Sequence, residues 1–383
     1  HPQSKAENQM YRIASPSKIS KRFGAKHSNK TGFNFQYLSY NLDIQQSLSE
    51  ETPMAQLANQ NGNSGLLQVY TQSKIDVLPK LTLNMGLNVQ YFLLNGNLSV
   101  EPRTGFKYQL NDIHSFAFAF GVHSRIEQLS VYFTEVSESQ PNKDLEFMKS
   151  SHYVFSYAAK LGNNMRFIAE PYFQKLNNVP VAPDSYISTL NNDNALFFNE
   201  TLCSEGTGRN IGIDFTLERF LHKGFYYLLT ASVYDSKYTA ADGIQRNTRY
   251  NKNYVFNIVA GKEWNIGKNK NKLLGVNARC NYLGGNRIEP VNIPLSIQQE
   301  KIIYGETAER KAFGLKFNDI PVVSFGISYR KNKPGYSSVW SVQVLNATRS
   351  EEFTDNYYNF KTGGIDTKYE GIMIPNFSYK IEF

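Results

Sequence analysis

Apolar and polar residues alternate along much of the chain, and this alternation predicts β-strands. In the clearest run, Leu81, Leu83, Met85, Leu87, Val89 and Tyr91 alternate with Thr82, Asn84, Gly86, Asn88 and Gln90. The same two-residue period returns at 115–123, 210–218, 274–282, 323–330 and 376–383. Because successive side chains of a strand point to opposite faces, each run predicts a strand with one apolar face and one polar face.

The links between these runs alternate in length. Short links occur at 78–80, 111–113, 162–164, 222–224, 267–271 and 331–335. Long polar links lie between them, at 47–64, 125–150, 177–207, 239–251, 284–320 and 346–370, with one exception, a short hairpin at 95–97. Short turns at one end and long loops at the other are typical of outer-membrane β-barrels.

These patterns predict an all-β protein, a transmembrane antiparallel β-barrel with about fourteen strands in this chain. Every long loop then lies outside the cell, and the chain ends on an alternating strand that closes with Phe383. The first thirty residues are polar, and we expect a loop there. A soluble β-sandwich is the alternative, but its loops would not alternate in length.

Composition supports a barrel with a wet interior. The 383 residues include 25 Tyr and 26 Phe, so that aromatics reach 14%, while the mean hydropathy stays at -0.45. No stretch approaches the roughly 20 apolar residues that a spanning helix needs. Aromatic girdles at the lipid boundary and a polar lumen account for both observations.

Charge and reactive residues exclude several classes of function. The net charge of +8 comes from scattered Lys and Arg with no basic run, which favours an anionic lipid surface over nucleic acid. Two cysteines, Cys203 and Cys280, allow one bridge but no metal cluster. The histidines show no ligand spacing and no nucleophile–base–acid set stands out, so we expect no metal, no cofactor and no enzymatic activity.

The motif Gly206-Thr207-Gly208-Arg209-Asn210 runs into the strand at 211–217, whereas a phosphate-binding glycine loop runs into a helix. Together with 211–214, 217–220 and 223–227, it resembles the late barrel of TonB-dependent outer-membrane receptors. The group that it resembles carries a carboxypeptidase-regulatory-like domain at the N-terminus. Further matches follow in the family's order, at 170–174, 179–181, 234–238, 246–248, 284–287, Pro290 and Phe383.

The resemblance implies a 22-stranded barrel filled by a plug domain. No plug and no TonB-binding segment is recognisable in this chain, so residues 1–383 are expected to form the C-terminal part of the barrel, with about eight strands missing. The implied function is active uptake of a ligand across the outer membrane of a Gram-negative bacterium. The implied partners are TonB through the plug, outer-membrane lipid and lipopolysaccharide, with a surface lipoprotein as a further candidate.

Two groups of charged residues are candidate sites. Arg209, Arg246 and Arg287 are expected at the outer mouths of strands, either binding an acidic ligand or lipopolysaccharide phosphates, or serving as ordinary rim charges. A second group is expected to face the lumen, either contacting the plug or simply lining a wet interior: Arg166, Glu170, Asp214, Glu218 and Arg279.

Two other functions stay open at this point. A self-contained barrel of about fourteen strands would act as a passive diffusion channel. A structural or secretion-associated barrel would bind partner proteins through its long loops. The sequence does not identify a transported ligand, since iron chelates, cobalamin, oligosaccharides and peptides are all carried by receptors of this architecture.

Overall fold

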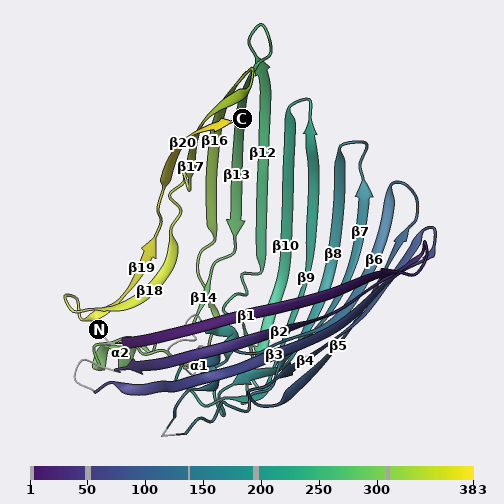
Figure 1. Ribbon diagram of the computed structural model, residues 1–383. Coiled ribbons are helices and arrows are strands. Elements are labelled where there is room, and N and C mark those ends of the chain that lie inside the picture. Colours follow the sequence, from purple (N-terminus) through teal and green to yellow (C-terminus); the bar gives the residue numbers. More distant parts are fainter. Residues whose placement is uncertain (1–3, 48–52, 137–138, 193–197, 308–310) are drawn as a thin grey trace.

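The computed structural model describes residues 4–47, 53–136, 139–192, 198–307 and 311–383, and strands dominate it (Figure 1). The main sheet contains β1 (Ser4–Arg22), β2 (His27–Gln46), β3 (Ala55–Leu78), β4 (Leu81–Phe92), β5 (Asn97–Gln109), β6 (His114–Arg125), β7 (Met148–Lys160), β8 (Met165–Val181), β9 (Cys203–His222), β10 (Phe225–Thr239), β11 (Gln245–Asn247), β12 (Tyr254–Ile266), β13 (Lys272–Leu283), β16 (Ile320–Lys333), β17 (Tyr336–Leu345) and β20 (Ile374–Glu382).

The loops carry the remaining elements. Two short strand pairs are β14 (Arg287–Ile288) with β15 (Leu315–Lys316), and β18 (Glu352–Asn359) with β19 (Gly364–Glu370). The helices are α1 (Leu129–Tyr132), the 3-10 turn η1 (Thr189–Asn191) and α2 (Ile293–Gln298). No helix in the described ranges is long and apolar enough to cross a membrane.

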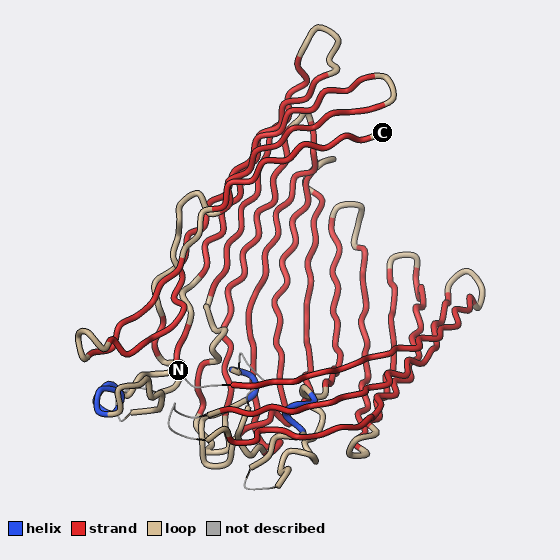
Figure 2. Tube along the Cα trace, turned by 60° about the vertical axis from the view of Figure 1, so that its left-hand side comes forward, coloured by secondary structure: helices blue, strands red, loops and turns tan. Residues whose placement is uncertain are grey.

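The main sheet is an antiparallel meander that follows chain order from β1 to β20. It is strongly twisted and curled, and its short turns gather at one end while the loops gather at the other (Figures 1 and 2). Among the described residues, β1 pairs only with β2, and β20 pairs only with β17. Both edges of the curled sheet are therefore without a strand partner in this part of the chain.

Alternation gives the sheet two chemically different faces. The outer face carries cross-strand aromatic pairs, such as Phe120 with Tyr153 and Trp340 with Tyr379, whose ring centroids lie 4.9 and 5.2 Å apart. The concave face carries polar ladders, in which Gln68 Nε2, for example, donates to Gln90 Oε1 at 2.8 Å. This inversion of the usual inside–outside rule suits a sheet with lipid on one side and water on the other.

The short turns require residues that accept a left-handed backbone. In the turn between β9 and β10, Lys223 and Gly224 have φ values of 51° and 73°. A Cβ at Gly224 would lie 2.2 Å from the carbonyl oxygen of Glu263, so only glycine fits. Positive φ at both central residues is the geometry of tight hairpins between twisted strands.

The prediction of a loop over the first thirty residues was wrong, because β1 and the start of β2 occupy them. The segment gives a weak signal, since β1 is an exposed edge strand and contains Pro16, which edges tolerate. The main sheet therefore has 16 strands, counting the short β11, where about fourteen were expected.

Four of the predicted long loops contain strands. The short β11 lies in 239–251, and the β14–β15 pair lies in 284–320. Residues 55–64 belong to β3 and pair with β2, and 352–370 fold into the β18–β19 hairpin. These last two segments lie toward the loop end of the sheet (Figure 1), and their sequences do not alternate between apolar and polar residues. The other predicted links hold with shifts at their ends, for example β8 extending to Val181 and β9 beginning at Cys203.

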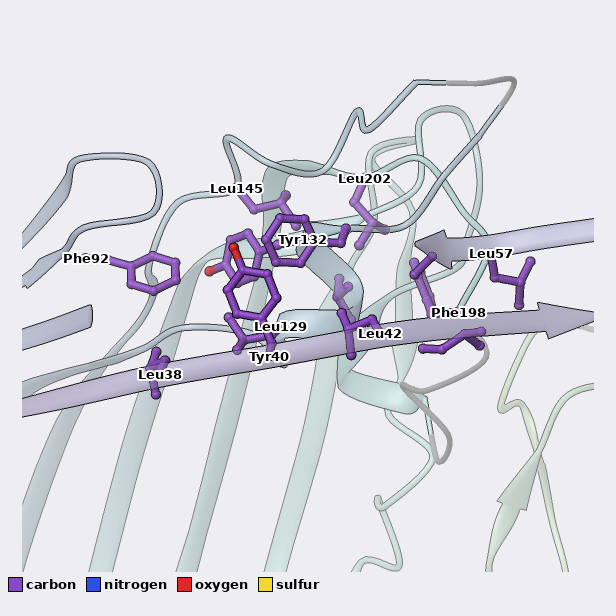
Figure 3. Packing of buried hydrophobic residues seen from close by; sticks show 14 of the residues in the cluster. Leu38, Tyr40, Leu42, Leu57, Phe92, Leu129, Tyr132, Leu145, Phe198 and Leu202 are labelled. Atoms are coloured by element: carbon purple, nitrogen blue, oxygen red, sulfur yellow. The ribbon is translucent and has the colours of Figure 1, made fainter. Parts of the chain in front are cut away.

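The largest buried apolar cluster lies at the loop end, on the concave face of β2. Leu38, Tyr40, Leu42 and Ile44 of β2 pack against α1 and against loop residues that include Leu145, Phe147, Phe198 and Leu202. Figure 3 shows Tyr40 and Leu42 facing Leu129 and Tyr132 of α1, and the rings of Tyr40 and Phe133 lie 4.7 Å apart. The loops thus fold over the sheet on an ordinary hydrophobic core.

A second loop cluster contains a buried cation, Arg246 of β11. Its side chain is 1% exposed, and its Nη2 donates to Asp242 Oδ2 and to Glu306 Oε2, each at 2.7 Å. The hydrogen bonds from Arg246 hold the pKa of both carboxyls below their ordinary values of 3.8 and 4.5. Glu306 also accepts a hydrogen bond from the amide of Ala312 in its own loop. The bond from Arg246 to Glu306 therefore ties the loop between β10 and β12 to the loop between β13 and β16.

We expect the two faces to respond oppositely to charge. Val276→Arg places a cation on the lipid face of β13 and should destabilise the folded protein by about 2–4 kcal/mol. Asn277→Arg, its neighbour on the wet face, should cost less than about 1 kcal/mol. Urea unfolding of the full-length protein in bilayers measures both, and equal losses would contradict the assignment of faces.

The Arg246 network should make loop packing depend on pH. Its contribution is fully present above pH 4.5 and is lost as the pH falls through the lowered pKa values of Asp242 and Glu306. Breaking a buried ion pair costs a few kcal/mol, and each 1.4 kcal/mol is a factor of ten. Arg246→Met should therefore speed amide exchange at Ala312 at least about tenfold at pH 7. Exposed Arg209→Met is the control, and unchanged exchange in Arg246→Met would contradict the network's role.

Candidate functional site

Four of the five predicted lumen residues lie together on the concave face of β8 and β9. Glu170 stands directly opposite Asp214, and Arg166 opposite Glu218. Arg166 Nε donates to Glu218 Oε2 at 2.6 Å, so this pair is already neutralised. Neither Glu170 nor Asp214 has a cation within ion-pairing distance in the described ranges. The wall therefore presents two uncompensated carboxylates side by side to the lumen.

A hollow of about 470 Å³ lies beside these carboxylates. Tyr172 of β8 and Tyr234 of β10 line it, and both pair with Gly212 of β9. A Cβ at position 212 would lie 2.7 Å from the Tyr172 hydroxyl, so the glycine leaves the space that the Tyr172 side chain occupies. The remaining lining is mostly hydrogen-bonding: Gln174, Asn210, Ser236 and Tyr250, with Val154 at one side.

Arg279, the fifth predicted lumen residue, lies on β13, away from this group. Its Nε donates to Asn281 Oδ1 of the same strand at 3.0 Å. It pairs across the sheet with Val259 and Ser324. Arg279 thus belongs to the wall but not to the hollow.

A larger hollow of about 830 Å³, which the sequence did not predict, lies across β3 to β7. Small residues on adjacent strands form its floor: Gly86, Gly105, Ala117, Ala119 and Gly121. His123 and His152 stand at one side with ring centroids 4.9 Å apart. The sequence shows small residues on the polar faces of several strands. Only the pairing register shows that these residues lie side by side.

The three arginines predicted at the outer mouth have three different environments. Arg246 is buried in the loop network described above. Arg287 is half-buried, and its guanidinium donates to the carbonyl of Asn251 at 2.7 Å and to Asn253 Oδ1 at 2.9 Å. Arg209 is exposed on β9, 4.0 Å from Asp235. They do not form one cationic ligand site.

The guanidinium of Arg287 donates hydrogen bonds to oxygens of neighbouring loops. Burial lowers its pKa, and its partners are carbonyl and amide oxygens rather than carboxylates. By holding Asn251 and the carbonyl of Phe313, it fixes two loops against each other.

An aromatic recess of about 400 Å³ opens between the 284–320 loop and the β18–β19 hairpin. The rings of Phe317 and Phe353 stack at 4.2 Å, and Tyr369 meets Phe317 edge-on at 6.1 Å. Asn286, Asn318 and Glu351 supply polar groups at its rim. Such a surface can stack a flat or ring-shaped ligand and hydrogen-bond its periphery.

Within the described ranges, no group of three or more His, Cys, Asp or Glu side chains is arranged to hold a metal ion. Cys203 and Cys280 are both free thiols, on β9 and β13. The described side chains offer aromatic stacking in the loops, and hydrogen bonding and negative charge on the concave face.

No protein-family model and no curated protein matches the sequence. Solved structures do match across nearly the whole chain. They include the ferric-catecholate import receptor Fiu of E. coli K12 (12% identity, TM-score 0.64, 99% of this chain and 55% of that chain). They also include the ferric preacinetobactin receptor BauA of Acinetobacter baumannii (12%, 0.65, 100% and 55%) and the outer-membrane transporter YddB of Escherichia coli (10%, 0.58, 100% and 54%).

The chain spans about half the length of the structures that it matches. The outer-membrane location expected from the sequence agrees with the match to YddB, an outer-membrane transporter. The described residues have the fold of the barrel wall of TonB-dependent outer-membrane receptors, as the sequence resemblance implied.

Proposed function

We propose that this chain is the wall of an outer-membrane transporter that takes up a ligand actively, with TonB acting through a plug domain. The observation that carries the proposal is the pair of unpartnered edges, β1 and β20, on a sheet whose outer face is apolar. Lipid does not tolerate unpaired backbone groups, so further strands must pair with both edges. The matched transporters, about twice as long, supply the precedent.

The two surfaces have separate roles in this proposal. The ligand first meets the outer loops, where the aromatic recess of Phe317, Phe353 and Tyr369 offers stacking. The plug contacts the concave wall, where Glu170 and Asp214 face the lumen without a cation. These carboxylates suit lysine or arginine side chains of the plug, because charge pairing is strong away from bulk water.

A plugged transporter and a passive channel differ in conductance. In planar bilayers, the full-length protein purified from its native outer membrane should show no steady ohmic conductance, because the plug fills the lumen. A self-contained channel would give stepwise openings without TonB. Reproducible open steps in protein that retains its folded mobility on gels would contradict the proposal.

The plug contact can be tested in cells. The double variant Glu170→Gln/Asp214→Asn should weaken the binding of the plug to the wall. Losing about 1.4 kcal/mol of charge pairing shifts the equilibrium between plugged and open wall by about tenfold. Sensitivity to vancomycin, which intact outer membranes exclude, should rise by about the same factor. Glu205→Gln, an exposed carboxylate on the same strand as Asp214, is the control and should change nothing. Wild-type sensitivity in the double variant, at equal protein level, would contradict the assigned contact.

A further inference from the structure

Five uncharged polar side chains interrupt the apolar outer face of the wall. This polar patch consists of Ser17 of β1, Asn29 and Thr31 of β2, and Thr71 and Ser73 of β3. Thr31 stands opposite Thr71, and Asn29 stands opposite Ser73. Residues that pair across strands project from the same face of a sheet. Ser17 shares this face, because its partner Phe33 lies two residues after Thr31 on β2.

The polar patch lies in the middle of the apolar band. Thr71 pairs with Leu87 of β4, and Ser73 pairs with Met85. These two β4 residues are the central outward positions of the run 81–91, which is about as long as a tilted strand needs to cross lipid. The patch is therefore at the depth of the acyl chains rather than at the headgroups.

The apolar band is continuous further round the wall. Along β8 and β9, every outward position within 167–173 and 211–217 carries an apolar side chain. On β2, by contrast, the outward residues Phe33, Phe35 and Tyr37 are preceded by two residues of the polar patch. Since the lipid face of a barrel is normally apolar, the patch indicates a contact other than lipid.

Hydrogen bonds within the polar patch suit a place without water. Asn29 Nδ2 donates to Thr71 Oγ1 at 3.0 Å and to Ser73 Oγ at 3.1 Å. Thr31 Oγ1 donates to Asn29 Oδ1 at 2.8 Å. The hydroxyl oxygens of Thr31 and Thr71 lie 2.9 Å apart, and Thr71 donates in this bond because the Thr31 proton is already used. Polar groups that leave water need such partners.

The remaining hydrogen-bonding capacity lies on opposite sides of β2. Thr71 Oγ1 accepts one bond and donates one, so it keeps a second lone pair. The hydroxyl of Ser17 is exposed on β1 and can donate. A two-fold axis along the membrane normal at β2 sets β1 of one copy against β3 of the other. Ser17 of each copy then meets Thr71 of its partner, as a self-complementary interface requires.

We propose that the polar patch is the interface at which two copies of the full-length protein associate in the membrane. Hydroxyl and amide groups hold membrane proteins together where apolar surfaces have no preference for each other over lipid. The patch holds no charge that would meet its like across the axis. Its charged neighbour on β1, Lys21, places Nζ 4.9 Å from the centroid of the Phe23 ring at the turn. The inference rests on the outer-membrane location and not on transport.

Disulfide cross-linking in native outer membranes tests the contact. The variant Ser17→Cys/Thr71→Cys carries one cysteine on each side of β2, in a background with Cys203→Ser and Cys280→Ser. Within one chain the two positions are separated by two strand spacings of about 4.8 Å each, too far for a disulfide. Bridges can form only between copies, so oxidation should give a covalent dimer on non-reducing gels.

The matched control is Phe173→Cys/Val233→Cys in the same background. Phe173 of β8 and Val233 of β10 lie two strands apart on the outer face and are 38% and 47% exposed. This control should stay monomeric. Equal dimer yield from both pairs would show random collision and overturn the inference, as would the absence of a dimer from the patch pair. A bridge to a different polypeptide would show that another protein covers the patch, and would overturn the second copy as its occupant.

A second measurement leaves cysteine chemistry out. The variant Asn29→Leu/Thr31→Val/Thr71→Val/Ser73→Ala keeps the face compatible with lipid but removes the pairing groups. Stepwise photobleaching of singly labelled full-length protein in supported bilayers counts copies. Wild type should bleach in two steps, and the variant should dimerise at least about tenfold more weakly.

Thr104→Val, which removes an outward hydroxyl on β5, is the control and should dimerise as wild type does. All variants are first checked for folded, heat-modifiable mobility. Single-step bleaching of wild type would overturn the dimer, and two-step bleaching of the patch variant at wild-type density would overturn the role of the patch. These outcomes leave the conductance test of the transporter untouched, so the two proposals fail separately.

Discussion

The structure depends on one constraint: a backbone amide or carbonyl in contact with lipid must find its partner within the protein. Long antiparallel strands meet this constraint along their length, and the tight left-handed turns, such as Lys223-Gly224, keep the register from one strand to the next. The same constraint makes β1 and β20 the most informative strands in the chain. Each satisfies only one side of its backbone among the described residues, and the proposed function rests on this.

Away from lipid the chain returns to the usual rule of apolar residues inside. The loops cover the concave face of β2 with a conventional core around Tyr40 and Tyr132. A second cluster is fastened by Arg246 between Asp242 and Glu306. These packed loops give the outer end of the wall a fixed shape, which an aromatic recess for a ligand requires. The wall and its loops are thus stabilised by different forces.

The sequence predicted the strands that cross lipid, because only there does lipid on one side enforce alternation, as at 81–91 and 323–330. It failed for β1, an exposed edge strand that contains Pro16, and for the outer part of β3 and the β18–β19 hairpin, whose sequences do not alternate. Alternation also placed Glu170 and Asp214 on the wet face, but their position opposite each other needed the register. The burial of Arg246 was beyond prediction, since its partner Glu306 lies on a distant loop.

The central claim is that this sheet is one part of a larger closed wall. Cryo-electron microscopy of the full-length protein from its native outer membrane, held in lipid nanodiscs, tests the claim most directly. The account predicts that β1 and β20 each hydrogen-bond to an additional strand that is not among the strands described for residues 4–383. Direct pairing of β1 with β20 would mean that the present strands close their own barrel, and would contradict the account.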